Sequence, residues 1–217
     1  MTATTVVLAT TNEHKVLELR RILAGTVAEL GLEVVGTSDF PGLAEVAETE
    51  VTFVGNATLK AAAVAAATGL PALADDSGLC VDVLGGAPGV FSARWSGSHA
   101  GLGASRAQKD RANLALLLEQ LADVPDEHRG AAFVCAAVAA TPDGRTAYRI
   151  GEVRGTIARV AKGSGGFGYD PVFVPADQPE GGSRHLAEYT DEEKNAISHR
   201  GRAFRALSPL LRDLLTA

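Results

Sequence analysis

The sequence from residue 69 to residue 97 reads GLPALADDSGLCVDVLGGAPGVFSARWSG and holds the most informative pattern of the chain. A short apolar run over residues 70–74 leads into two adjacent carboxylates, Asp75 and Asp76, and a second apolar run follows over residues 79–84. This pattern predicts a strand that ends in a charged turn. Ligands of open α/β sheets bind at the ends of strands, so the pair is a candidate site. A plain surface turn is the alternative, because Asp, Ser and Gly also dominate turns for conformational reasons.

The length and charge of the chain limit the classes of protein to which it can belong. Its 217 residues fit one large domain or two small lobes, and no change of composition marks a linker, so we expect a single domain over residues 1–217. The formal net charge of −6 argues against nucleic acid as a partner, because nucleic-acid binding needs a basic surface. Apolar runs fall well short of the roughly 20 residues of a membrane span. With no signal-peptide pattern at the first residues, we expect a cytoplasmic protein without a membrane partner.

The first residues of the chain predict a strand, a polar turn and a helix. Residues 4–9 are apolar and rich in β-branched side chains, and residues 13–23 place apolar side chains on one helical face. The turn brings Thr10 and its neighbours to a helix N-terminus, where backbone N–H groups and the helix dipole favour an anion. Lys15, one turn into the helix, can add a positive charge for a phosphate. A simple Asn or Thr cap with a solvated lysine is the alternative.

A second helix is predicted over residues 52–68, which are rich in alanine. Asn56 and Lys60 are four residues apart and share one face of this helix, so both could point into a cleft. The acidic residues 39–50 that precede the helix are expected to form a loop. Acidic runs are usually solvated, yet Glu48 in this run is a candidate functional carboxylate.

The remaining elements are predicted from apolar periodicity and from turn residues. The sequence Thr-Pro-Asp-Gly between two apolar runs indicates a hairpin. The expected strands cover residues 32–35, 131–140, 145–150 and 151–160, and the expected helices cover residues 105–121 and 202–215.

Residues 163–171 form a glycine-rich loop, GSGGFGYDP, in which the backbone can approach a ligand closely. Phe167 and Tyr169 in this loop could stack on a base. A flexible connector is the alternative, although two aromatic side chains and an Asp-Pro pair argue against plain flexibility. A small basic cluster follows this loop in the sequence, comprising Lys194, His199 and Arg200.

Together these groups suit a phosphorylated substrate and a divalent metal. Carboxylates bind Mg²⁺, which keeps several waters and is shared with substrate phosphates, and lysines take the remaining phosphate charge. The anionic candidates are Glu48, Asp75 and Asp76. The cationic candidates are Lys15, Lys60, Lys194, His199 and Arg200.

Five blocks of sequence carry a resemblance to a known family: LATTNEHK (8–15), TFVGNATLKA (52–61), PALADDSGLCVDVLGGAPGVFSAR (71–94), GGFGYDPVF (165–173) and EKNAISHRGRA (193–203). In this order they resemble the nonstandard purine nucleoside triphosphate pyrophosphatases, also called inosine/xanthosine triphosphate diphosphatases or dITP/XTP pyrophosphatases. The resemblance runs nearly from end to end of the chain. Five blocks in order with family-like spacing are specific, whereas any one alone would be weak.

This resemblance implies an α/β fold and a reaction. The fold would be an elongated two-lobed one around a long mixed β-sheet with flanking helices, with the active site in the cleft between the lobes. The protein would be a homodimer. It would catalyse the Mg²⁺-dependent hydrolysis of ITP, dITP and XTP to the nucleoside monophosphate and pyrophosphate, which cleanses the nucleotide pool.

The resemblance also implies roles for individual residues. Asp76 and Lys60 would be catalytic, with Asp76 as proton acceptor, while Glu48 and Asp76 would bind the metal. Asn56 would join Lys60 on the phosphate side. The triphosphate would lie against Thr10, Thr11, Asn12, Glu13, His14 and Lys15, although family members often carry a small residue where this chain has His14. The remaining substrate contacts would be Ser77, Phe167, Gly168, Tyr169, Asp170, Lys194, His199 and Arg200.

Two other functions stay open from the sequence. The chain could be a pyrophosphatase for other modified nucleotides, such as methylated pyrimidine triphosphates, on a related fold; the blocks over residues 167–170 and 198–201 favour purines instead. It could also be a nucleotide-binding regulator without turnover. The combination of Glu48, Asp75, Asp76 and Lys60 argues against the regulator, because mere binding needs no carboxylate that activates water.

Overall fold

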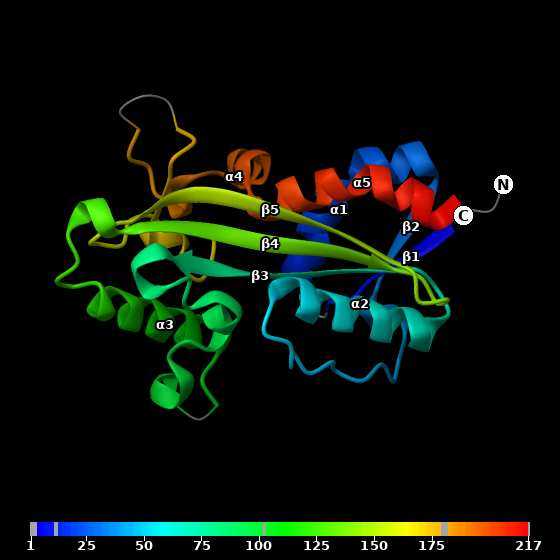
Figure 1. The fold of residues 1–217 in the computed structure, drawn as a ribbon, viewed down its shortest axis with the longest axis horizontal. Coiled ribbons are helices and arrows are strands. Elements are labelled where there is room, and N and C mark those ends of the chain that lie inside the picture. The colour runs from blue at the N-terminus through cyan, green and yellow to red at the C-terminus, as the bar shows by residue number, and fades with distance from the viewer. Residues whose placement is uncertain (1–3, 11–12, 102, 179–181, 217) are drawn as a thin grey trace. The chain divides into compact units, whose positions relative to one another are not determined.

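The computed structural model describes residues 4–10, 13–101, 103–178 and 182–216 of the chain, and its architecture is α/β (Figure 1). The strands of the described residues form one six-stranded sheet. Its parallel and antiparallel pairs make the sheet mixed, as the family resemblance implies: β1 is parallel to β2 and β3, and β5 is antiparallel to β6. The order across the sheet is β2 (Leu32–Gly36), β1 (Thr4–Leu8), β3 (Ala72–Val81), β4 (Gly130–Ala140), β5 (Thr146–Ile157) and β6 (Phe173–Pro175).

The described chain forms two compact units. The first takes the residues up to Asp76, residues 135–151 and those from His199 onward, and the second takes residues 77–134 and 152–198. No described helix combines the length and the apolar character that a membrane crossing requires. The helices of the first unit are α1 (Glu13–Leu30), α2 (Phe53–Thr68) and α5 (His199–Thr216), and those of the second are α3 (Arg106–Gln120) and α4 (Asp191–Ile197).

In the first unit, helices pack against both faces of the sheet. α1 and α5 contact each other and share a buried cluster that contains Leu19, Phe204 and the strand residue Val6. α2 belongs to a different cluster, in which Ala57 packs with Val7 of the same strand. Val6 and Val7 are adjacent and enter different clusters because successive side chains of a strand point to opposite faces. The same alternation holds in the parts of β3 and β4 that belong to this unit: Leu73 and Ala137 join the α1–α5 cluster, whereas Ala74 and Val138 join the α2 cluster.

In the second unit, α3 and two aromatic rings form the core. The rings of Phe133 and Phe173 have their centroids 4.7 Å apart, and Leu117 of α3 is fully buried in the same cluster. Buried Arg129 donates from Nε to the carbonyl of Ile157 at 2.7 Å and from Nη1 to the carbonyl of Leu121 at 2.5 Å. Because Leu121 follows the last residue of α3, this guanidinium ties the end of that helix to the end of β5.

The helix ends follow the local chemistry of the sequence. The Oγ1 atom of Thr52 accepts a hydrogen bond from the Gly55 amide at 3.0 Å and so caps α2, which ends at Gly69 in the left-handed conformation with φ 67°. The predicted helix over residues 52–68 is thereby confirmed. The predicted helix over residues 13–23 is also present, but α1 continues to Leu30, and α5 begins at His199 rather than at residue 202.

Two predictions about strands are wrong. Asp75 and Asp76 lie in the middle of the ten-residue strand β3, not in a turn at its end, because each carboxylate finds a cation on its own face of the sheet. The predicted strands over residues 145–150 and 151–160 are one strand, β5. Gly151 within it is no break: a Cβ atom there would lie 2.1 Å from the carbonyl oxygen of His199, so the glycine permits close packing of α5.

Candidate active site

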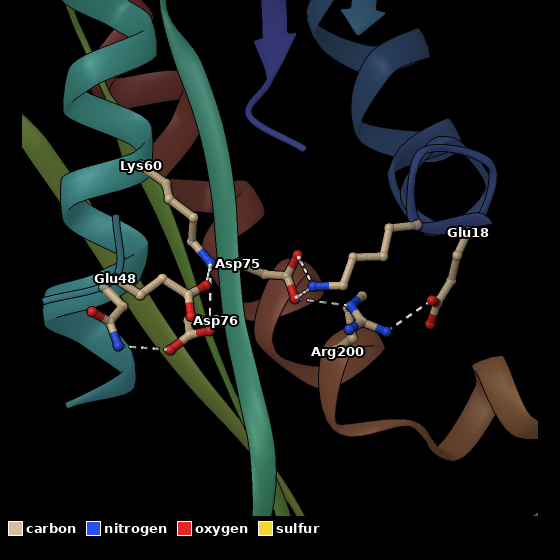
Figure 2. Close-up of polar contacts among 8 residues, drawn as sticks. Glu18, Glu48, Lys60, Asp75, Asp76 and Arg200 are labelled. Carbon is tan, nitrogen blue, oxygen red and sulfur yellow. Dashed lines mark hydrogen bonds and ion pairs between the residues drawn. The ribbon is translucent and has the colours of Figure 1, made fainter. Parts of the chain in front are cut away.

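The candidate site is built on both faces of β3 at two adjacent residues. Because Asp75 and Asp76 are neighbours on one strand, their side chains point to opposite faces of the sheet. Figure 2 shows the consequence, with Lys60 and Glu48 on one side of the strand and Arg200 and Glu18 on the other. All six of these residues belong to the first unit.

On the α2 face, Asp76 is held by two side chains of that helix. The Nζ atom of Lys60 lies 3.4 Å from Oδ1 of Asp76, and the Nδ2 atom of Asn56 donates to Oδ2 at 3.3 Å. The prediction that Asn56 and Lys60 share a helix face is confirmed, since both reach one carboxylate. Asn56 also accepts a hydrogen bond from the Glu50 amide at 2.9 Å through Oδ1. That bond joins the preceding loop to the helix.

Glu48 comes from the acidic loop and meets the same lysine. Its Oε1 atom lies 2.9 Å from Nζ of Lys60, so one ammonium bridges two carboxylates (Figure 2). The loop passes close to the start of α2, where Gly55 leaves the necessary room: a Cβ atom at this position would lie 2.6 Å from Cβ of Glu50. The predicted pairing of Glu48 with the strand carboxylate is therefore achieved through loop and helix packing.

The charges on this face are not balanced. Two carboxylates and one ammonium give a formal charge of −1. Burial raises the pKa of Asp76, and the negative charge of Glu48 adds to this effect, although Lys60 and Asn56 oppose it. Burial would lower the pKa of Lys60, but the charges of Asp76 and Glu48 outweigh it and the pKa is raised. This group therefore comprises a charged lysine, a carboxylate that is a better proton acceptor than usual and a second carboxylate, with a formal charge of −1 among the three.

The donor set fits a small divalent cation. Mg²⁺ typically takes one or two carboxylates and completes its shell with water and substrate phosphate oxygens. Glu48 and Asp76 are two such carboxylates, already brought to one cation by Lys60. Within the described residues, no three His, Cys, Asp or Glu side chains are grouped to hold a metal by themselves. A metal on Glu48 and Asp76 would therefore take its other ligands from water and the substrate.

On the opposite face, Asp75 is enclosed by two cations. Its Oδ2 atom lies 3.1 Å from Nζ of Lys15 and 3.1 Å from Nε of Arg200, and its side chain is 1% exposed. Arg200 in turn places Nη1 2.8 Å from Oε2 of Glu18. Burial would raise the pKa of Asp75, but Lys15 and Arg200 outweigh it and hold the pKa below its ordinary value. The two acids and two bases on this face balance in charge.

A separate group of predicted site residues lies in the second unit. The Nζ atom of Lys194 lies 2.5 Å from Oδ2 of Asp170 and 4.8 Å from the centroid of the Phe167 ring. The same Asp170 oxygen accepts a hydrogen bond from the Phe167 amide at 2.7 Å. Phe167 is 47% exposed, so its ring remains accessible to a stacking partner. Lys194, Asp170 and Phe167 thus form one compact group that contains a donor, an acceptor and an aromatic face.

Hydrogen bonds to Ser92 and Asp110 hold the glycine-rich loop around this group in place. Tyr169 is buried, and its hydroxyl donates to the carbonyl of Ser92 at 2.9 Å, so it packs in the core rather than offering a stacking surface. The Gly168 amide donates to Oδ2 of Asp110 at 3.3 Å. Gly166 has a φ of 70° and leaves no space for a side chain, because a Cβ atom there would lie 2.1 Å from Oδ2 of Asp170. The loop is therefore shaped by its partners and is not a plain connector.

The other predicted residues have simpler positions. Thr10 follows β1, and its carbonyl accepts a hydrogen bond from Oγ1 of Thr37 at 2.9 Å. Thr11 and Asn12 lie outside the described residues, and Glu13 and His14 begin α1. Ser77 follows Asp76 on β3. His199 opens α5, so it and Arg200 belong to the first unit whereas Lys194 belongs to the second, and the cluster predicted from these three residues is divided between the units.

Three residues that contact predicted site residues were not themselves predicted from the sequence. Glu18 pairs with Arg200, Asp110 accepts from Gly168, and Ser92 accepts from Tyr169. A signal existed only for Glu18, which lies three residues after Lys15 and therefore on the same face of a predicted helix. The partners of Asp110 and Ser92 are 58 and 77 residues away, a separation that no local pattern reveals.

Comparison with known proteins places this geometry in a family. The model of the Ham1 family matches residues 6–210. The chain belongs to the Ham1 family. A dITP/XTP pyrophosphatase of Streptomyces coelicolor is 57% identical over 212 residues, which cover 98% of this chain and 99% of the relative. The recognition made from the five sequence blocks is therefore confirmed.

Solved structures of Ham1 relatives share the fold. The crystal structure of the nucleoside-triphosphatase, or dITP/XTP pyrophosphatase, of Mycobacterium abscessus is 48% identical with a TM-score of 0.74, covering 96% of this chain and 99% of that one. The Ham1 protein of Staphylococcus aureus is 35% identical with a TM-score of 0.80, covering 97% and 99%. The expected α/β class is confirmed by this likeness, and the expected enzyme class agrees with the names of the relatives.

Proposed function

We propose that this Ham1 family chain is a nucleoside triphosphate pyrophosphatase that hydrolyses dITP, XTP and ITP to the monophosphate and pyrophosphate. Relatives that are nearly as long as the chain carry the name dITP/XTP pyrophosphatase. The observation that carries the proposal is the group on the α2 face of β3, in which Lys60 bridges Glu48 and Asp76. A protein that only bound nucleotides would have no need of a buried carboxylate with a raised pKa beside a lysine.

The residues of this face divide the work of hydrolysis. Mg²⁺ on Glu48 and Asp76 would supply positive charge for the phosphates and lower the pKa of a bound water. Asp76 accepts the proton of the water that attacks phosphorus, a role for which its raised pKa suits it. Asn56 fixes the Asp76 carboxylate through Oδ2. Lys60 and, from the other face, Lys15 neutralise the charge that develops on the departing pyrophosphate.

Base selection is assigned to the second unit. Hypoxanthine and xanthine present a carbonyl at position six, where adenine presents an amino group. The ammonium of Lys194 would donate to that carbonyl, while adenine would leave donor facing donor, at a cost of about 1–3 kcal/mol for each unpaired group. Phe167 offers its exposed ring for stacking. Arg200 is a second donor in the sequence-based proposal, but its Nε and Nη1 atoms donate to Asp75 and Glu18, so Lys194 is the first choice.

We also propose Mg²⁺ as the metal, a homodimer as the assembly, and a single functional domain made of both units. The resemblance of the five sequence blocks to the pyrophosphatase family supports these three proposals. A cytoplasmic location fits a role in cleansing the pool of precursors for nucleic-acid synthesis.

A substrate panel tests the proposed function. Pyrophosphate release is followed with Mg²⁺ from dITP, ITP, XTP, GTP, ATP and dTTP, and the Asp76→Asn variant serves as the matched control. We expect dITP, ITP and XTP to be turned over at least about 10-fold faster than ATP, which corresponds to one unpaired polar group. Release of orthophosphate, or equal turnover of ATP and ITP, contradicts the proposal. Preferred turnover of dTTP, the methylated pyrimidine triphosphate of the panel, favours the related pyrophosphatase, and no release of pyrophosphate from any of the six favours the regulator.

A further inference from the structure

Glu18 is at one end of the chain of ion pairs on the α1–α5 face of β3. Its carboxylate contacts Nη1 of Arg200 at 2.8 Å, Nε of Arg200 contacts Asp75 at 3.1 Å, and Asp75 contacts Nζ of Lys15 through both oxygens, at 3.1 and 3.3 Å. Figure 2 shows the line from Glu18 through Arg200 to Asp75. Glu18 and Lys15 lie three residues apart on α1, so this helix supplies both ends of the network.

The position of Arg200 is costly without its partners. It is the second residue of α5, where the positive end of the helix dipole disfavours a cation. Its side chain is only 3% exposed. A buried guanidinium at such a place needs carboxylates to hold it, and Asp75 and Glu18 both contact it.

Two groups compete for the Lys15 ammonium, the buried Asp75 carboxylate and the substrate phosphate, and Arg200 relieves this competition. The proposed function requires the Lys15 ammonium to turn toward a phosphate, yet that ammonium is also a partner of Asp75, whose side chain is 1% exposed. If Lys15 were the only cation on Asp75, its departure would leave a buried charge unpaired, which is strongly unfavourable. With Arg200 on the same oxygen, Asp75 keeps a cation when Lys15 moves.

We propose that Glu18 is a positioning residue for phosphate binding: by holding Arg200 on Asp75, it leaves Lys15 able to bind the substrate's phosphate chain. The proposal rests on the proposed function. It assigns Glu18 no contact with substrate. Its effect reaches the substrate through two ion pairs and one lysine.

The test measures binding of inorganic tripolyphosphate with Mg²⁺ by isothermal titration calorimetry. We expect Glu18→Ala to raise the Kd about 10-fold, equivalent to about 1.4 kcal/mol, because Arg200 loses its outer partner. Glu18→Gln keeps an acceptor for Arg200 without the charge, and its Kd should lie between those of Glu18→Ala and the wild type. In dITP hydrolysis, Glu18→Ala should raise KM while kcat at saturation stays within about 3-fold, the pattern of lost binding.

Glu29 provides a matched control. It is another glutamate of α1 that pairs with an arginine of α5, Arg212, but both side chains are more than half exposed. Glu29→Ala should leave the Kd for tripolyphosphate within about 2-fold of the wild type, because exposed ion pairs contribute little.

Three outcomes overturn the proposal. They are an unchanged Kd in folded Glu18→Ala, an equal rise in Glu29→Ala, and no binding of tripolyphosphate by the wild type. If the first outcome comes with a lower melting temperature of Glu18→Ala, the ion pair is merely structural. Failure of the proposed function is a different result: the wild type binds tripolyphosphate but releases no pyrophosphate from dITP.

Discussion

Asp75 and Asp76 are the same residue type at consecutive positions of one strand, yet their surroundings differ in almost every respect. Asp75 has a side chain that is 1% exposed and two cationic partners, whereas Asp76 is 11% exposed and shares one lysine with Glu48. The pKa of Asp75 is lowered and the pKa of Asp76 is raised. The strand only divides the two carboxylates between its faces. The helices packed on each face decide which one is neutralised and which one stays reactive.

This difference indicates a division of labour within one short segment. The Asp75 ion-pair network is balanced in charge and its central carboxylate is enclosed, which suits a group that fixes α1, α5 and β3 to one another. Glu48, Asp76 and Lys60 together carry a net negative charge and Asp76 is less buried than Asp75, which suits a group that receives a metal, a water and a proton. Substitutions on the two faces should therefore affect different properties of the protein.

The largest effect is expected from Asp76→Asn. Removal of the proton acceptor should lower kcat for pyrophosphate release from dITP by about 10²–10⁴-fold, the usual contribution of general base catalysis. The free energy of unfolding should stay equal or rise, because burial disfavours the Asp76 charge in the folded state. Steady-state kinetics and urea unfolding check both parts. A variant that keeps more than a tenth of the wild-type kcat would remove Asp76 from the base role.

Asp75→Asn should show the reverse pattern, with stability as the main loss. It removes the charged partner of buried Arg200 and of half-buried Lys15, and breaking a buried pair costs about 3–5 kcal/mol. We expect a fall of that size in the free energy of unfolding, measured by urea denaturation. Glu29→Ala, which breaks an exposed pair between the same two helices, should change it by less than about 1 kcal/mol. Equal losses in the two variants would contradict the structural role of Asp75.

Lys60→Met removes the cation that bridges the two carboxylates on the Asp76 face. Without the bridging ammonium, Glu48 and Asp76 face each other as like charges, so the pKa of Asp76 should rise further. We expect the acid limb of the kcat profile to move to higher pH and kcat to fall about 10–100-fold, because a charged group at the leaving phosphate is lost. Lys60→Arg, which keeps the charge, should recover part of the activity. An unshifted acid limb in Lys60→Met would argue against coupling of the three groups.

A sizeable part of this arrangement follows from the sequence. The caps at Thr52 and Gly69 are local, and the i,i+4 spacing of Asn56 and Lys60 predicts their common face. The burial of the two aspartates within a strand does not follow, because the cations that make it possible lie far along the chain. Lys15 is 60 residues from Asp75, and Arg200 is 125 residues from it. Isolated from those partners, two aspartates before Ser-Gly have the composition of a turn.

The smallest effects are expected in the pH dependence of stability, where the two carboxylates should act in opposite directions. The folded pKa of Asp75 lies below the unfolded value of about 3.9, so its contribution is present above that pH and is lost as the pH falls through the folded pKa. The folded pKa of Asp76 lies above the unfolded value, so its contribution to stability grows as the pH falls through the folded pKa. Urea unfolding between pH 3 and pH 7 should therefore show a reduced acid loss in Asp75→Asn and a reduced acid gain in Asp76→Asn. Slope changes of the same sign in both variants would contradict the assignment.

The most direct test of the division between the two faces is a crystal structure with Mg²⁺ and a non-hydrolysable dITP analogue. We expect a metal ion coordinated by Glu48 and Asp76 and by phosphate oxygens, with Asp75 still bonded to Arg200. A metal ion coordinated by Asp75, with Asp76 away from both the metal and the attacking water, would contradict this division.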